Sequence, residues 1–145
     1  MLLSLSVPAW AHAHLTASTP ADGAVVRSPP ASLQLDFTEA VQKRFSLFVV
    51  LPLSVPVEAG ESAHDRSLRV HALAAQLADT VMADKGAVKG RVDTGLARPG
   101  GAAKQVTIEL ARDLSPGTYV LVWRALSVDT HVTHGIVVFT VASGG

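Results

Sequence analysis

Two segments near the end of the chain, residues 119–128 and 135–141, constrain the fold more than any other part of the sequence. The first reads Tyr-Val-Leu-Val-Trp-Arg-Ala-Leu-Ser-Val and the second Gly-Ile-Val-Val-Phe-Thr-Val. β-Branched and aromatic residues at this density favour strands over helices. The segment between them is short, so the two strands can pair antiparallel. The chain should therefore be built around an antiparallel β-pair.

Five further segments have the pattern of strands. Residues 33–37 alternate apolar with polar side chains, which indicates a strand with one buried and one solvated face. Residues 46–53 form an apolar run, typical of a strand buried on both faces until Pro52 ends it. The remaining three candidates are residues 15–20, 68–71 and 105–110. The first of these ends in a proline, which cannot donate a backbone hydrogen bond, so we expect it at the edge of a sheet.

Turn signals rich in proline, glycine and aspartate separate these segments, for example at residues 21–24, 28–30 and 114–117. About seven short strands joined by turns predict an all-β fold, a seven-stranded Greek-key β-sandwich of the immunoglobulin-like or cupredoxin-like kind. The length of 145 residues is typical of one domain with one core.

Only residues 72–84 are expected to be helical, because they are rich in alanine and leucine and place Leu73, Leu77 and Val81 at helical spacing. Several glycines follow. We therefore expect residues 65–101 to form an insertion with a small helix and a long flexible part, without a domain boundary.

The first eleven residues predict a secretory signal. They are apolar, end in Ala-Trp-Ala, which is typical of a signal-peptidase site, and are too short to cross a bilayer. A basic region before them is missing, so the signal is expected to be short or truncated. Cleavage after Ala11 would make His12 the first residue, and cleavage after Ala13 would make His14 the first. The alternative is a first strand that stays attached; otherwise residues 12–145 form the mature domain.

Composition excludes several classes of function. Twelve basic and twelve acidic residues balance, so neither a basic surface for nucleic acid nor a tether to an anionic membrane is indicated. Without cysteine, disulfides, thiolate metal sites and cysteine nucleophiles are excluded. A metal would be held mainly by nitrogen and oxygen donors, which favours Cu(II), Zn(II) or Ni(II). The sequence also lacks a Gly-x-Ser-x-Gly elbow and a glycine-rich phosphate loop.

Metal-binding side chains occur at both ends of the predicted mature chain. Asp129 and His131 follow the long strand two residues apart, and on an extended backbone they would project to the same side. This pair cannot fill a coordination sphere alone. His12 and His14 are the other candidates, so a site exists only if the fold brings the two regions together.

Several motifs in order along the chain resemble the CopC family of periplasmic copper-binding proteins, including its YobA-like members. They are His-Ala-His-Leu at 12–15, Ser-Thr-Pro-Ala-Asp-Gly at 18–23, Leu-Gln-Leu-Asp-Phe-Thr-Glu at 33–39, Leu-Ser-Pro-Gly-Thr-Tyr at 114–119, Trp-Arg at 123–124 and Ser-Val-Asp-Thr-His at 127–131. The resemblance implies a β-sandwich whose N-terminal histidine binds Cu(II) through its amine and ring.

On this resemblance the metal ligands are His12, Asp129 and His131, with Asp129 either a ligand or a group that orients a ring. His14, Glu39 and His134 are possible additional ligands or supporting residues. The family pattern places an aliphatic residue where Leu15 stands, which favours cleavage after Ala11. It also implies a copper carrier or buffer that acts with a CopD-like inner-membrane copper transporter. No nucleic-acid partner and no membrane insertion after processing are expected.

Alternatives remain at this stage. His12 and His14 could wrap Cu(II) with the amine and two backbone amides, a mode that needs a flexible terminus. The histidine brace of copper-dependent polysaccharide monooxygenases uses a similar histidine pair, and a structural immunoglobulin-like module would use none of these residues. Three departures from the family stand out: a single central methionine, Met82, which predicts no thioether site; the insertion; and His134, which on an extended chain would face away from His131.

Overall fold

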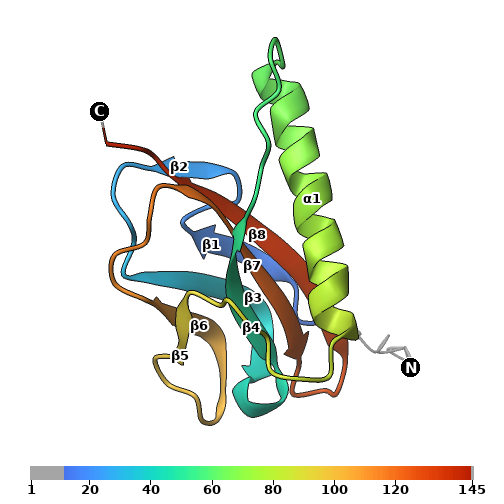
Figure 1. The fold of residues 1–145 in the computed structure, drawn as a ribbon. Helices are drawn as coiled ribbons and strands as arrows, with labels where there is room; N and C mark the ends of the chain where they lie inside the picture. The colour runs from blue at the N-terminus through green and yellow to red at the C-terminus, as the bar shows by residue number, and fades with distance from the viewer. Residues whose placement is uncertain (1–11, 145) are drawn as a thin grey trace, which may run out of the picture.

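Two four-stranded sheets pack face to face in the computed structural model, which describes residues 12–144 (Figure 1). One sheet has the order β1-β3-β6-β5 and the other β2-β8-β7-β4. The strands are β1 (Leu15–Thr19), β2 (Ala24–Val26), β3 (Ser32–Gln42), β4 (Leu47–Leu53), β5 (Asp93–Leu96), β6 (Ala102–Leu110), β7 (Gly117–Leu126) and β8 (Val132–Val141). A short 3-10 helix, η1 (Lys43–Phe45), and one helix, α1 (Ala63–Ala83), complete the described elements. The predicted β-sandwich is confirmed, with eight strands in place of the seven expected.

The expected antiparallel pair at the end of the chain forms the centre of the second sheet. β7 and β8 pair along their whole length, from Gly117 opposite Val141 to Leu126 opposite Val132. β1 lies at the edge of the first sheet beside β3, as its closing proline predicts. This arrangement brings the start of β1 and the start of β8 to the same end of the sandwich (Figure 1).

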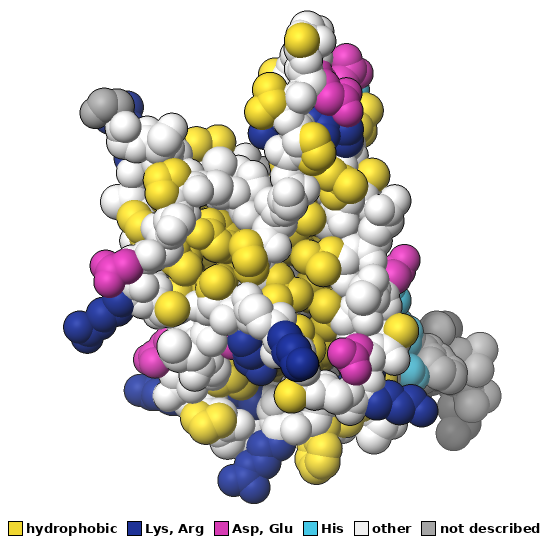
Figure 2. All heavy atoms as spheres, in the orientation of Figure 1, with side chains coloured by type: hydrophobic (Ala, Val, Ile, Leu, Met, Phe, Trp, Pro, Cys, Tyr) yellow, Lys and Arg dark blue, Asp and Glu magenta, His cyan; other side chains and the backbone are white. Residues whose placement is uncertain are grey.

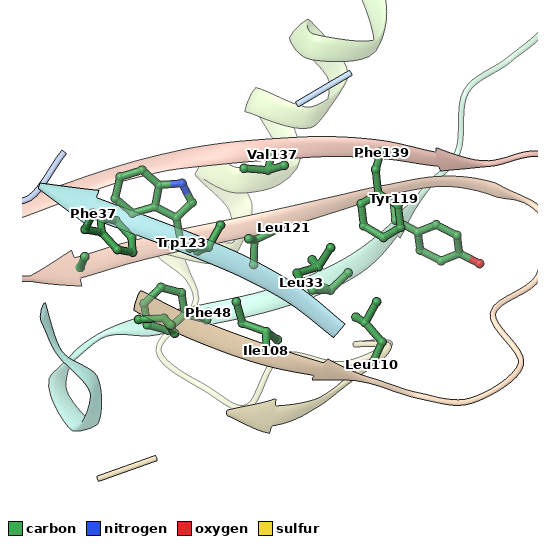
Figure 3. Packing of buried hydrophobic residues seen from close by; sticks show 14 of the residues in the cluster. Leu33, Phe37, Phe48, Ile108, Leu110, Tyr119, Leu121, Trp123, Val137 and Phe139 are labelled. Atoms are coloured by element: carbon green, nitrogen blue, oxygen red, sulfur yellow. The ribbon is translucent and has the colours of Figure 1, made fainter. Parts of the chain in front are cut away.

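The main core fills the space between the sheets (Figure 3). Alternate residues of β3, Leu33, Leu35 and Phe37, are buried there, as the period of two requires. At one end of this core the ring of Trp123 packs edge-on against Phe37, with ring centroids 5.2 Å apart. At the other end Tyr119 stacks on Phe139.

A second apolar cluster lies between α1 and the outer face of the second sheet. It explains why the apolar run of β4 is buried on both sides: Phe48 and Val50 face the main core, and Val49 and Leu51 face the helix layer. The buried positions Val70, Ala74 and Val81 form one stripe of α1. Apolar side chains are visible along the junction between α1 and the sheet (Figure 2).

Two predictions about this part of the chain were wrong. The helix begins at Ala63, nine residues before the expected start at 72, and residues 68–71 are helical rather than a strand. Ser62 caps the helix by accepting a hydrogen bond from the Asp65 amide, and this Ser-x-x-Asp pattern is a start signal that sequence reasoning missed.

Part of the expected flexible insertion belongs to the sandwich. β5 pairs with the edge of β6, and buried Asp93 accepts a hydrogen bond from the Val50 amide while forming an ion pair with Arg91. β2, three residues long and parallel to β8, was not predicted either. Within residues 12–144, no helix combines the length and apolar character needed to cross a membrane.

Candidate metal centre

The two candidate metal-binding regions meet at one end of the sandwich. The imidazole rings of His12 and His131 lie with centroids 4.4 Å apart and nearly perpendicular, at 81°. The Oδ2 atom of Asp129 is 3.1 Å from Nδ1 of His131. Figure 2 shows histidine side chains on the side of the molecule near the lower end of α1. Residues more than a hundred positions apart in sequence are therefore neighbours.

A tight turn, rather than an extended chain, brings Asp129 and His131 together. Thr130 has a positive φ of 71° and residues 128–130 turn, so the expected extended geometry was wrong although the two side chains do converge. Fully buried Ser127 organises the turn. Its hydroxyl donates to the Asp129 carboxylate and accepts from the His131 amide at 3.2 Å, and its own amide donates to the His131 carbonyl at 2.9 Å.

Hydrogen bonds from two threonines hold the segment around His12 in place. The Thr38 hydroxyl donates to the His12 carbonyl at 3.0 Å and accepts from the His14 amide at 2.9 Å. The Thr133 hydroxyl donates to the Ala13 carbonyl at 2.6 Å, which links the segment before β1 directly to β8. Ala13 itself is fully buried in the main core.

The electrostatics of the turn favour an ionised carboxylate. The pKa of Asp129 lies below its usual value, chiefly because the Ser127 hydroxyl donates a hydrogen bond to it and further because of His131. An ionised Asp129, with Oδ2 at 3.1 Å from Nδ1 of His131, favours one orientation of that ring. Two imidazoles and one carboxylate at this separation offer the nitrogen and oxygen donors that Cu(II) and Zn(II) bind.

The remaining candidates lie around this centre. The ring of His14 is exposed and its centroid is 6.0 Å from that of His12. His134 is exposed on β8 opposite Arg124, on the face that carries α1. Glu39 is half-buried in β3 and makes no hydrogen bond or ion pair with any residue from 12 to 144. Within the same range, no three His, Asp or Glu side chains are arranged to hold a metal ion by themselves.

Ser127, Thr38 and Thr133 are the residues that sequence reasoning did not single out. Ser127 and Thr38 occur in the motifs already quoted, but serine and threonine are common on strands and turns. Ser127 bonds Asp129 and His131 within its own turn, whereas the partners of Thr38 and Thr133 lie far away in the chain. Only the packing of the segment before β1 against β3 and β8 gives the two threonines a role.

Comparison with known proteins identifies the family. The family model described as "CopC domain" matches residues 15–82 and 71–142. The chain belongs to the CopC family. Among curated relatives of this CopC protein, Protein YobA of Escherichia coli K12 is 30% identical over 139 residues, covering 95% of this chain and 86% of YobA. Copper resistance protein C of Pseudomonas syringae pv. tomato is 32% identical over 137 residues, covering 94% and 86%.

Solved CopC-family structures have the same fold. PcoC, described as a copper resistance protein from Escherichia coli, is 26% identical, with a TM-score of 0.56 and coverage of 88% of this chain and 98% of that one. CopC from Methylosinus trichosporium OB3b, 21% identical, gives a TM-score of 0.55 with coverage of 90% and 94%. The resemblance seen in the sequence motifs is thus confirmed.

Proposed function

We propose that this protein binds one Cu(II) ion between the two ends of its chain, with the rings of His12 and His131 as ligands and Asp129 as a further ligand or as the group that orients His131. The approach of the two rings to 4.4 Å supports this proposal more than any other observation. Cu(II) prefers a planar set of nitrogen and oxygen donors and heads the divalent affinity series. Relatives named for copper resistance agree with this choice of metal.

The fourth donor is proposed to be the amine that signal cleavage creates. The described side chains alone do not form a three-ligand group, and a free amine at His12 would add the missing nitrogen beside its own ring. An α-amine has a pKa of about 7.7–8.0 and must lose its proton to coordinate, so affinity should fall as the pH falls. Export would therefore complete the site.

The packing of the first described residues supports cleavage after Ala11. Cleavage after Ala13 would remove His12, the buried Ala13 side chain and the carbonyls that Thr38 and Thr133 bond. The same packing disfavours wrapping of the metal by backbone amides, because the His14 amide already donates to Thr38.

The proposed role is that of a periplasmic carrier or buffer. It would deliver copper to a CopD-like inner-membrane transporter or keep copper from it. An oxidative enzyme of the histidine-brace kind is less well supported, because five of the six aromatic side chains in residues 12–144 are buried and only Phe45 is exposed to offer a sugar a flat surface. Oxidation of chitin or cellulose by the copper-loaded protein with a reductant would favour that enzyme instead.

Calorimetric titration of the processed protein with Cu(II) tests the proposal. The chain that begins at His12 should bind one tight equivalent, and His12→Ala or His131→Ala should weaken it by about 100-fold or more, since loss of even a supporting residue costs about 10- to 100-fold. His64→Ala, at the far end of α1, is the matched control and should bind like the parent. A chain with one extra residue before His12 keeps both rings but displaces the amine and should also bind more weakly. Unchanged affinity in His12→Ala would remove the proposal.

A further inference from the structure

Exposed apolar side chains gather at the end of the sandwich that carries the proposed copper centre. Phe45 in η1 is 67% exposed, and Val128, which directly precedes Asp129, is 53% exposed. Both line one hollow of about 510 Å³, between η1, the start of β6 and the turn that joins β7 to β8. Single exposed apolar residues are ordinary on a protein surface, but two that line the same hollow indicate a place that another molecule covers.

Basic side chains surround this hollow. Arg44 lines it, and Lys43 and Arg98 line a second hollow of about 680 Å³ that shares a lining residue with the first. Among the described residues that line the two hollows, none is acidic, and these three cations form no ion pair within residues 12–144. The carboxylate of Asp36 accepts a hydrogen bond from Gln105 in the second hollow, so the cations remain in excess. Figure 2 shows Lys and Arg side chains together with apolar side chains at the lower end of the molecule.

Hydrogen bonds connect this surface to the turn that carries two of the proposed copper ligands. The Gln42 side-chain amide donates to the Ser127 carbonyl at 3.1 Å, and the Val128 amide donates to the Ala40 carbonyl at 3.1 Å. The connection from β3 to β4, the β5–β6 loop and the β7–β8 turn all lie at the same lower end in Figure 1. A surface that is already held in this way loses little conformational freedom when a partner binds.

We infer that residues 43–45, Arg98 and Val128 form a docking surface for an acidic segment of a partner protein. An apolar side chain of that segment would fill the hollow between Phe45 and Val128, and its carboxylates would face the three basic side chains. An apolar centre with charges around it is the arrangement of specific protein interfaces, and opposite charges speed association. A flat lipid surface would leave both hollows unfilled, so the shape favours a protein over an anionic membrane. That the partner exchanges copper with this chain rests on the proposed function, whereas the docking itself does not.

Binding of a labelled peptide to the copper-free chain tests the inference. The probe is a synthetic peptide that repeats Glu-Leu-Glu-Phe, compared with one that repeats Gln-Leu-Gln-Phe, and fluorescence anisotropy of the label reports binding. At low salt the acidic peptide should bind about tenfold or more tightly than the neutral one, and added salt should reduce this difference because it screens exposed charges. Phe45→Ala should weaken binding of the acidic peptide by about fivefold or more. Arg44→Gln should weaken it by about two- to fivefold.

Matched controls lie at the other end of the molecule. Leu68→Ala removes an exposed apolar side chain from the first half of α1, and Arg27→Gln removes an exposed cation after β2. Both variants should bind the acidic peptide like the parent. Equal binding of the two peptides by the parent would overturn the inference, and so would unchanged binding in both Phe45→Ala and Arg44→Gln. If the parent instead sedimented with phosphatidylglycerol vesicles and ignored the acidic peptide, the surface would belong to a membrane and the inference would be wrong.

The docking and the proposed copper binding can fail separately. Neither Phe45 nor Arg44 is a proposed copper ligand, so both variants should keep the Cu(II) equivalent in calorimetry. Conversely, His131→Gln should lose tight copper binding and still bind the acidic peptide like the parent. Loss of peptide binding in His131→Gln would mean that the peptide contacts the metal centre rather than the docking surface, and would overturn the inference.

Discussion

Gly135→Ala is expected to destabilise the protein through a single contact. The Cβ atom of an alanine at this position would lie 2.7 Å from Cζ2 and 2.9 Å from Cε2 of Trp123, closer than real Cβ atoms approach other atoms. The indole ring cannot withdraw freely, because it is buried and its other neighbour in the core is the ring of Phe37. Either β8 or the tryptophan must shift.

The size of the effect follows from two opposing contributions. Overpacking a core typically costs about 1–3 kcal/mol. Replacing glycine by alanine also lowers the conformational entropy of the unfolded chain, which stabilises the folded protein by about 0.4–1 kcal/mol. The free energy of unfolding should therefore fall by about 1–2 kcal/mol.

Urea denaturation followed by Trp123 fluorescence measures this change. With a denaturant slope of about 2 kcal/mol per molar urea, the midpoint should fall by about 0.5–1 M. Gly100→Ala is the matched control, because the nearest atom to its added Cβ is an Arg44 side-chain nitrogen at 3.9 Å and its midpoint should not fall. If Gly135→Ala had the midpoint of the control, the close packing of Trp123 on β8 would be refuted.

Three further changes have defined outcomes. The pKa of His71 is raised, first by its bond to the Ser67 carbonyl and then by Asp22. Protonated His71 therefore stabilises the fold fully below its unfolded pKa of about 6.5, and this stabilisation is lost as the pH rises through the higher folded pKa. The melting temperature of the copper-free parent should fall more between pH 6 and 8 than that of His71→Gln. Thr38→Val removes hydrogen bonds worth about 0.5–1.5 kcal/mol and should weaken the first Cu(II) equivalent by about two- to tenfold in calorimetry. Asp93→Ala leaves the Val50 amide unpaired in the core and should lower the free energy of unfolding by about 1–3 kcal/mol in urea.

Each of these changes has a control of the same residue type. His64→Gln should leave the pH profile of the parent unchanged, and Thr16→Val, which alters an exposed hydroxyl of β1, should leave copper affinity unchanged. Asp79→Ala, on the exposed face of α1, should change the free energy of unfolding by no more than about 0.5 kcal/mol. A test variant that behaves like its control contradicts the corresponding argument.

Periodic patterns predicted the sandwich well. The alternation in β3, the apolar run of β4 and the paired strands β7 and β8 all follow from side chains that face a core on one side or on both. The helix was predicted too short, because the missed stretch, residues 63–71, carries mostly polar and charged side chains and buries only Val70. β5 was missed because its own residues do not form a strand pattern. It is held in the sheet by pairing with the edge of β6 and by the Arg91–Asp93 ion pair.

The proposed metal centre was predictable in its residues but not in its geometry. The approach of His12 to His131 depends on Thr38 and Thr133, and the orientation of Asp129 depends on Ser127. The partners of the two threonines are set by the order of strands in two sheets, which no local pattern encodes, whereas the Ser127–Asp129 bond lies within one turn.

The position of the proposed centre also determines when it can exist. Its parts belong to the segment before β1 and to the turn before β8, so every strand from β1 to β7 must leave the ribosome before they can meet. A nascent or unfolded chain offers copper isolated imidazoles only. Because the proposed ligands lie far apart in the sequence, unfolding would separate them and release the ion. Bound copper would therefore stabilise the folded protein against unfolding.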